Sequence, residues 1–266
     1  MPSNKRQKEL ARRRAERQAA RRAAERAKRR RRRVWGVLSV TGVALGVALI
    51  LLLVNVLGGD KKKTEAGGGP CEVVKNDSEN TGGKKPGLPP DPAFGETKAL
   101  DATLALTQGT VEVQLFADRA PCATNSFRFL AAQKYFDGQL CHRETATEGL
   151  TVLQCGDPTA SGSGGPGYTF KDENLPTAGP AGTAVYPRGT LAMANSGPAT
   201  NGSQFFLVIK DSQLPPNYTV FGKVMKGLEV LDKIAAKGLK DDGGQGDGKP
   251  KEDVKITSAT VANPPS

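Results

Sequence analysis

The chain has 266 residues and a formal net charge of +11. Residues 1–33 carry 16 Lys or Arg against three Glu, a net charge of +13, so the remaining residues together sum to −2. The basic character belongs to this tail alone, which argues against nucleic acid as the substrate of the rest of the chain.

Residues 34–57 form an uninterrupted stretch of 24 residues without a charged side chain. A helix of about 20 apolar residues spans the hydrocarbon core of a bilayer, so this stretch predicts a single transmembrane helix. A buried helix of a soluble domain is the first alternative, but such helices are usually shorter and amphipathic. A cleaved signal peptide is the second, although its apolar region is normally about 7–15 residues and ends in small residues.

The charges on either side of this stretch predict its orientation. Because positively charged flanks stay in the cytoplasm, residues 1–33 are expected inside and all residues after 58 outside. The tail is rich in Ala, Arg and Glu and is expected to lie on anionic lipid headgroups. Binding of nucleic acid or ribosomes by the tail is the alternative.

Residues 58–94 are rich in Gly, Pro, Lys, Asp and Asn without apolar periodicity, which predicts a flexible extracytoplasmic linker. A domain is expected over residues 95–264. Apolar residues alternate with more polar ones over 100–106 and 111–115, on either side of a short turn at 107–109, which predicts a hairpin. Helical spacing over 118–135, with Pro121 in the first turn, predicts a helix.

Further strands are expected near Cys141, Val152, Leu191, Phe205 and Val220, followed by a helix over 228–236 and a last strand over 254–261. About eight strands and two helices suffice for an all-β fold with a closed antiparallel barrel capped by the helices. The polar, glycine-rich residues 238–251 are expected to form a surface loop.

The four cysteines are Cys71, Cys122, Cys141 and Cys155, and all of them follow the apolar stretch. An even number outside the cytoplasm permits disulfides, and four cysteines allow three pairings. Neighbouring antiparallel strands favour Cys141 with Cys155, which would leave Cys71 to join Cys122. Free buried thiols are the alternative. The spacings of a zinc site are absent, so no metal is expected.

Two short apolar segments and a polar loop between them stand out at residues 190–209, TLAMANSGPATNGSQFFLVI. Such a loop places polar groups beside an apolar surface, an arrangement that can bind an extended peptide. This run resembles the signature segment of the cyclophilins, a family of peptidyl-prolyl isomerases. Further pieces follow the order of that family over roughly residues 95–262, and they are CHR (141–143), VLQCGD (152–157), GSGGPG (162–167), FKDEN (170–174) and VFGKV (220–224).

The resemblance implies an eight-stranded barrel with two capping helices, and it implies roles for individual residues. Arg143 corresponds to the catalytic arginine, and Gln154 matches a position that orients this arginine or binds the substrate. Eight positions match the substrate groove: Val152, Gly162, Ala194, Asn195, Gln204, Phe206, Leu214 and Tyr218. His142, the only histidine, is expected to be structural.

Four departures from the family pattern concern the pocket and its surroundings. The segment between Arg143 and Gln154 is longer than usual, and Thr151 stands where the family has a pocket Phe, with Leu150 as its replacement. Tyr218 stands where many members carry His. Gln213 replaces the Trp of cyclosporin-sensitive members, which predicts weak cyclosporin affinity.

The sequence therefore predicts a membrane-anchored, actinobacterial-like isomerase that acts on proline-containing segments of exported proteins, as a monomer and without a cofactor. One alternative is a module that binds such segments with little turnover. Another is that the basic tail carries the function and the domain is a passenger. The glycine-rich residues 162–167 lack the Lys-Ser/Thr ending of a phosphate loop and lead into no helix, so a nucleotide role is not expected.

Overall fold

The computed structural model describes residues 70–79, 81–92, 99–240 and 245–262. The predicted tail, and the transmembrane segment predicted over residues 34–57, lie outside these residues. Within the described part of the chain, no helix has both the length and the apolar character needed to cross a membrane.

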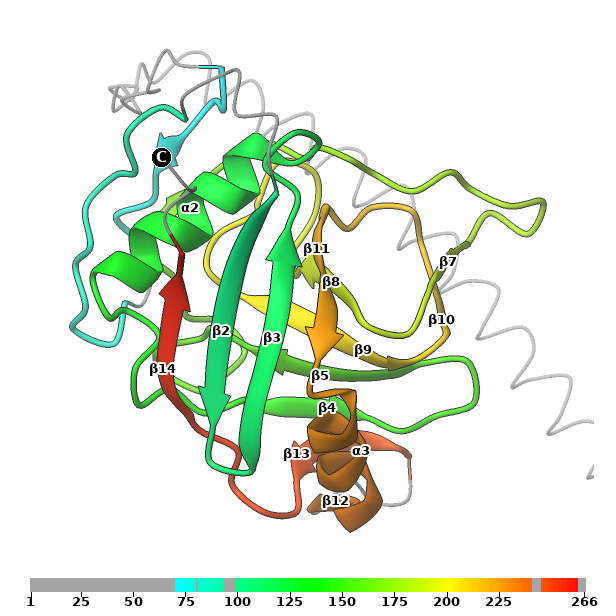
Figure 1. The fold of residues 1–266 in the computed structure, drawn as a ribbon. Coiled ribbons are helices and arrows are strands. Elements are labelled where there is room, and N and C mark those ends of the chain that lie inside the picture. The colour runs from blue at the N-terminus through cyan, green and yellow to red at the C-terminus, as the bar shows by residue number, and fades with distance from the viewer. Residues whose placement is uncertain (1–69, 80, 93–98, 241–244, 263–266) are drawn as a thin grey trace, which may run out of the picture. The chain divides into compact units, whose positions relative to one another are not determined.

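The fold is all-β with two α-helices in the described residues (Figure 1). The main sheet has ten strands in the order β12-β13-β4-β5-β9-β8-β11-β3-β2-β14, and β1 with β6 and β7 with β10 form two small additional sheets. The elements are β1 Val74–Lys75, β2 Leu100–Leu106, β3 Gly109–Leu115, α2 Pro121–Ala132, β4 Arg143–Thr145, β5 Thr151–Cys155, β6 Tyr168–Thr169, β7 Ala184–Tyr186, β8 Thr190–Met193, β9 Phe205–Lys210, β10 Ser212–Leu214, β11 Val220–Lys226, α3 Leu228–Lys237, β12 Leu239–Lys240, β13 Asp247–Pro250 and β14 Ile256–Val261.

The predicted hairpin is confirmed as β2 and β3, which pair from Leu100 with Leu115 to Leu106 with Gly109. The predicted first helix is confirmed as α2, with Pro121 in its first turn. No side chain of its own N-terminal residue caps this helix. Instead, the carboxylate of Glu173 accepts a hydrogen bond of 2.7 Å from the Ala123 N–H, which satisfies one free donor and complements the helix dipole.

Apolar residues on both faces of the central strands explain why β9 is a continuous apolar run. Phe205, Leu207 and Ile209 point into the main core, together with Phe127 of α2. Phe206 and Val208 point to the opposite face and join a second apolar cluster beneath β7 and β10. A strand buried on both faces loses the alternation of polar and apolar residues. The second cluster is where the site described below is built.

The predicted closed barrel of eight strands differs from the structure, because the main sheet curls but carries no hydrogen-bonded ladder between its outer strands β12 and β14. Residues 138–141, which precede β4, instead pair with residues 254–256 at and just before the start of β14. Cys141 N–H donates to Val254 O at 2.8 Å, and Gly138 N–H donates to Ile256 O at 2.8 Å. These bonds pair polar backbone groups without requiring regular strands.

The flexible linker predicted over residues 58–94 is wrong for its described part. Residues 71–79 and 81–92, which we call the strap, follow the surface of the domain beside α2 (Figure 1). A disulfide joins Cys71 to Cys122 of α2, and β1 pairs with β6. Low apolar content indicated disorder, but covalent and backbone bonds to distant residues hold this segment.

The surface loop predicted over residues 238–251 is also wrong in part. It contains β12 and β13, and β13 extends the main sheet by pairing Asp247 with Thr145 and Gly248 with Glu144 of β4. Backbone pairing with β4 stabilises this polar segment without apolar side chains. The second disulfide, Cys141 to Cys155, lies next to these strands.

Candidate active site

Arg143 and Gln154 lie opposite each other on β4 and β5. Because side chains alternate between the faces of a strand, both project to the outer face, whereas Leu153 and Cys155 lie in the main core. The Nη1 group of Arg143 donates a hydrogen bond of 3.1 Å to Oε1 of Gln154. The sheet register therefore brings together the two residues expected to be catalytic.

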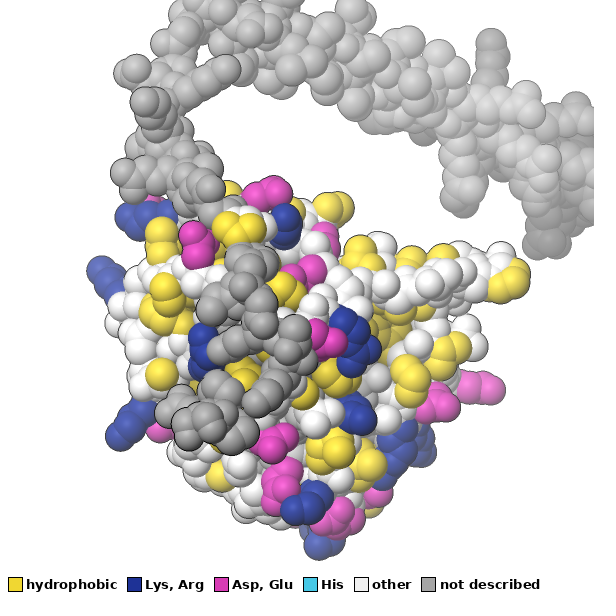
Figure 2. Space-filling view, turned by 45° about the horizontal axis from the view of Figure 1, so that its top comes forward, with side chains coloured by type: hydrophobic (Ala, Val, Ile, Leu, Met, Phe, Trp, Pro, Cys, Tyr) yellow, Lys and Arg dark blue, Asp and Glu magenta, His cyan; other side chains and the backbone are white. Residues whose placement is uncertain are grey.

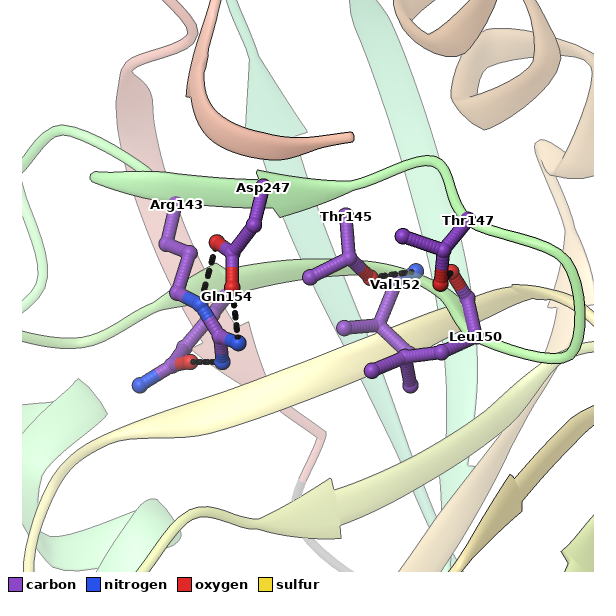
Figure 3. Close-up of polar contacts among 7 residues, drawn as sticks. All are labelled: Arg143, Thr145, Thr147, Leu150, Val152, Gln154 and Asp247. Atoms are coloured by element: carbon purple, nitrogen blue, oxygen red, sulfur yellow. Dashed lines mark hydrogen bonds and ion pairs between the residues drawn. The ribbon is translucent and has the colours of Figure 1, made fainter. Parts of the chain in front are cut away.

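Asp247, at the start of β13, holds the same guanidinium from its other side (Figure 3). Nε of Arg143 donates to Oδ1 at 2.8 Å, and Nη2 donates to Oδ2 at 2.7 Å. This paired hydrogen bond raises the pKa of Arg143 and lowers the pKa of Asp247. A bidentate pair of this kind fixes the plane of the guanidinium as well as its position.

The polar network continues from Gln154 into a glycine-rich loop. Nε2 of Gln154 donates to Oε1 of Gln204 at 2.8 Å, and Gln204 donates to the carbonyls of Gly162 and Gly164. Asp157 is fully buried beneath this loop and accepts backbone N–H groups from it, including those of Gly162 and Gly164. The carboxylate of Asp157 thus fixes the backbone of the loop. The side-chain amides of Gln204 and Gln154 connect the loop to Arg143.

An apolar pocket of about 170 Å³ opens beside the guanidinium. Its lining residues come from the four strands β4, β5, β9 and β10 and from loops next to the strands, and they are Arg143, Leu150, Val152, Gln154, Ala194, Asn195, Phe206, Leu214 and Tyr218. The structure thus brings together eight of the ten residues expected at the site. The other two, Gly162 and Gln204, line a second pocket that adjoins the apolar pocket.

Aromatic side chains form the wall of the apolar pocket. The rings of Phe206 and Tyr218 meet edge to face with centroids 5.5 Å apart. Behind them Tyr186 contacts both rings, and its hydroxyl donates to the carbonyl of Pro215 at 3.0 Å. Edge-to-face packing is the favoured geometry for such rings, and the tyrosine hydroxyl fixes the loop that presents Tyr218.

Leu150, and not Thr151, completes the pocket. Thr151 is buried and its N–H donates to Ser212 Oγ at 3.0 Å, whereas Leu150 lines the cavity. The longer segment after Arg143 is accommodated by a turn in which Thr147 Oγ1 donates to the Leu150 carbonyl at 3.2 Å (Figure 3). The Thr147 N–H donates to the same carbonyl at 3.0 Å. The lengthened turn therefore presents an aliphatic side chain where the family pattern has an aromatic one.

Asn195 is positioned to pair with an extended chain. Its side chain is occupied, since Nδ2 donates to the Asn217 carbonyl at 2.8 Å and Oδ1 accepts the Gly197 N–H. Its main-chain N–H and C=O make no hydrogen bond with any residue that the structure describes. A free donor and acceptor at the rim of a pocket can pair with the backbone of a peptide.

Sequence reasoning missed Asp247 and Tyr186. Asp247 stands in a polar segment with no pattern that distinguishes one of its acidic residues from another. Its role depends on the pairing of β13 with β4, residues that are about 100 positions apart. Tyr186 is one of four tyrosines and lies outside the motifs quoted above, so no local signal marks it.

A known protein family matches the part of the chain that contains this site. Residues 101–261 match the family model described as cyclophilin type peptidyl-prolyl cis-trans isomerase. The chain belongs to this family. Both catalytic candidates and the whole apolar pocket fall inside the matched residues, whereas the strap lies before them.

Two curated relatives illustrate the extent of the similarity. "Probable peptidyl-prolyl cis-trans isomerase B" of Mycobacterium tuberculosis is 47% identical over 182 residues, which cover 65% of this chain and 56% of that protein. "Peptidyl-prolyl cis-trans isomerase-like 3" of Homo sapiens is 37% identical over 170 residues, covering 62% of this chain and 98% of that protein. The chain thus spans little more than half the length of the mycobacterial relative.

A solved structure supports the fold assignment. The crystal structure of a cyclophilin type peptidyl-prolyl cis-trans isomerase of Cryptosporidium parvum is 29% identical and superposes with a TM-score of 0.51. It covers 63% of this chain and 100% of that chain. The cyclophilin fold of the described domain is therefore shared over the full length of that protein.

Proposed function

We propose that this cyclophilin accelerates the cis–trans isomerisation of Xaa-Pro bonds in polypeptides outside the cytoplasm. The observation that carries the proposal is the guanidinium of Arg143, held by Gln154 and Asp247 at the mouth of an apolar pocket. Isomerisation of such bonds takes tens of seconds or more without a catalyst, which is slow enough to limit folding.

The chemistry requires a hydrogen-bond donor beside the proline nitrogen. Rotation about the carbon–nitrogen bond costs about 18–20 kcal/mol, because it removes partial double-bond character. In the twisted form a lone pair is localised on that nitrogen. A donor placed there stabilises the twisted form more than either planar form, which is the requirement for catalysis.

Arg143 retains donors for this purpose. Of the five N–H groups of a guanidinium, Nε–H and one on Nη2 bond to Asp247, and one on Nη1 bonds to Gln154. One N–H on each terminal nitrogen therefore remains for a substrate. The proline ring fits the apolar pocket, while the main-chain groups of Asn195 pair with the residues next to it.

Two features support a membrane-anchored location. Residues 34–57 have the length and composition of a transmembrane helix with a strongly basic cytoplasmic flank. The two disulfides are typical of proteins that fold in an oxidising compartment. Exported polypeptides that contain proline would then be the substrates.

The activity is tested on the full-length chain in detergent, with an Ala-Ala-Pro-Phe peptide and its isomerisation rate as the readout. We expect Arg143→Ala to lower kcat/KM by about 100-fold, the effect typical of removing one preorganised donor. Arg188→Ala is the matched control, because this arginine also pairs with an aspartate but belongs to neither pocket. Equal rates for wild type and Arg143→Ala would contradict the proposal.

A module that binds proline segments without useful turnover is the second candidate. It is favoured by one observation, the aliphatic Leu150 in place of an aromatic pocket residue. The same peptide separates the two candidates. Saturable binding of the peptide by wild type, together with rates no higher than those of Arg143→Ala, would support the binding module.

The location is tested separately with alkaline phosphatase fused after Ser266, since this reporter is active only outside the cytoplasm. We expect high reporter activity in cells expressing the full chain, and low activity when residues 34–57 are deleted. High activity that survives this deletion would contradict the anchor.

A further inference from the structure

The strap places a charged side chain at the substrate groove. It precedes the residues matched by the family model, and it is fastened at several points to the domain. Besides the disulfide and the β1–β6 pair, Nζ of Lys84 donates to the carbonyls of Tyr135 and Asp137, and Nδ2 of Asn125 donates to the Pro90 carbonyl at 2.6 Å. These contacts on both sides of Glu79 fix the course of the backbone near it.

The Glu79 side chain enters the glycine-rich loop. Its Oε2 accepts the Gly167 N–H at 2.8 Å. Its carboxylate lies against Gly165, where a Cβ atom would be only 2.1 Å from Oε1. Any side chain at position 165 would therefore expel Glu79. Oε1 has no hydrogen-bond donor among the residues that the structure describes.

Glu79 forms part of the wall of the second pocket, a cavity of about 100 Å³. This pocket shares Gln154, Ala194 and Asn195 with the apolar pocket, so the two are adjacent in one groove. Its other lining residues are small or uncharged: Gly162, Ser163, Gly164, Ser196, Thr200, Gly202, Ser203 and Gln204. Among the described lining residues, Glu79 alone is charged.

The electrostatic surroundings of Glu79 favour a positive partner. Burial raises the pKa of Glu79, the Gly167 N–H lowers it, and the nearby carboxylate of Asp157 raises it. A partly buried carboxylate beside a second carboxylate is stabilised by a cation, because the cation offsets both the desolvation and the repulsion.

We propose that the second pocket is a specificity subsite for a cationic side chain, Lys or Arg, within a few residues of the proline in the client polypeptide. The inference rests on the isomerase function proposed above. An extended residue advances about 3.3 Å, so a side chain two or three positions from the proline reaches an adjacent pocket. The ammonium or guanidinium group binds Glu79 by a charge-assisted hydrogen bond.

The test measures kcat/KM of the full-length chain for a series of proline peptides in which Lys, norleucine or Glu occupies one position at a time near the proline. Isomerisation is followed by NMR exchange, which needs no coupling protease. We expect wild type to prefer Lys to norleucine by about tenfold at one position, equivalent to about 1.4 kcal/mol, and to disfavour Glu there. In Glu79→Gln the ratio of Lys to norleucine falls to about one.

Glu72→Gln is the matched control. Glu72 also belongs to the strap, but it pairs with Lys171 at the exposed surface and does not line the second pocket. We expect this variant to keep the wild-type preference. A wild type without preference at any position, or a preference that persists in Glu79→Gln, would overturn the inference while leaving the isomerase function intact.

Failure of the proposed function is recognised separately. If wild type turns over no peptide faster than Arg143→Ala does, the same peptides are titrated for binding. A ratio of dissociation constants for norleucine and Lys near ten in wild type and near one in Glu79→Gln then supports the subsite, and equal constants in wild type overturn it.

Discussion

The guanidinium of Arg143 is held by the carboxylate of Asp247 through two hydrogen bonds, although the two residues are 104 positions apart. Asp247 does not line the apolar pocket, so in the proposed isomerisation it would act only through Arg143. Its carboxylate holds the plane of the guanidinium, and Gln154 holds the opposite edge. Asp247 is therefore a positioning residue.

Asp247→Ala should lower kcat roughly tenfold with little change in KM, because small displacements of a catalytic group are costly while the pocket itself is intact. Asp247→Glu should restore part of the loss. The readouts are steady-state kinetics and the thermal midpoint. Asp232→Asn removes a similar bidentate pair, with Arg188, that lines neither pocket, and it should retain the wild-type rate. An unchanged kcat in Asp247→Ala would contradict the positioning role.

The same pair predicts how activity depends on pH. Arg143 lowers the pKa of Asp247 below its usual value of 3.8. The interaction is therefore complete above pH ~3.8 and is lost only as the pH falls through the lower, folded-state pKa. We expect kcat to show no ionisation of this pair between pH 5 and 8. An acidic limb within that range that disappears in Asp247→Asn would contradict this assignment.

Glu144 should make stability depend on pH near neutrality. It is fully buried, both carboxylate oxygens lack a partner in the described residues, and burial raises its pKa from 4.5 to about 7. The folded chain thus binds this proton more tightly than the unfolded chain. The contribution of Glu144 to the free energy of unfolding should be greatest below pH 4.5, fall by about 3 kcal/mol as the pH rises to about 7, and then level off.

Glu144→Gln should remove the contribution of Glu144 and so reduce the fall in the free energy of unfolding. The measurement is urea unfolding of the oxidised protein at intervals between pH 4.5 and 8.5. Glu148→Gln, an exposed change on the turn that follows β4, should retain the wild-type pH dependence. If the free energy of unfolding changes with pH in the same way in wild type and in Glu144→Gln, then a group other than Glu144 titrates.

Loss of the Cys71–Cys122 disulfide should destabilise the domain and release the strap. The bridge closes a loop of 51 residues, and bridges of this kind contribute about 3–4 kcal/mol. We expect the double variant Cys71→Ser, Cys122→Ser to show a lower thermal midpoint and faster proteolysis within the strap. If proteolysis of the strap is as slow as in wild type, β1 and Lys84 suffice to hold it.

Cyclosporin should bind weakly, because Gln213 supplies neither the ring nor the indole donor of sensitive members of the family. In the structure Gln213 is exposed on β10, beside Leu214 of the apolar pocket. We expect Gln213→Trp to tighten binding at least tenfold, measured by titration of tryptophan fluorescence or by inhibition. A nanomolar dissociation constant for wild type would contradict this prediction.

The local patterns of the sequence were sufficient for much of the fold and for most of the site. Alternation predicted the β2–β3 hairpin, helical spacing predicted α2, and a second helix was expected where α3 lies. The family resemblance identified most of the residues that line the apolar pocket. These signals are local, since the period of two or 3.6 residues reports which face of an element is buried. The segment between Arg143 and Gln154 is longer than in the family pattern, and this extra length had indicated that Leu150 replaces the pocket aromatic.

The tertiary structure alone decided the features that connect distant polar segments. The strap was predicted to be flexible and residues 238–251 to be a surface loop, because neither segment has an apolar face. Backbone pairing, a disulfide and charge-assisted hydrogen bonds stabilise them instead, and these bonds depend on partners distant in the chain. Hence Asp247 reaches Arg143, and Glu79 reaches the groove, through contacts that no local pattern encodes.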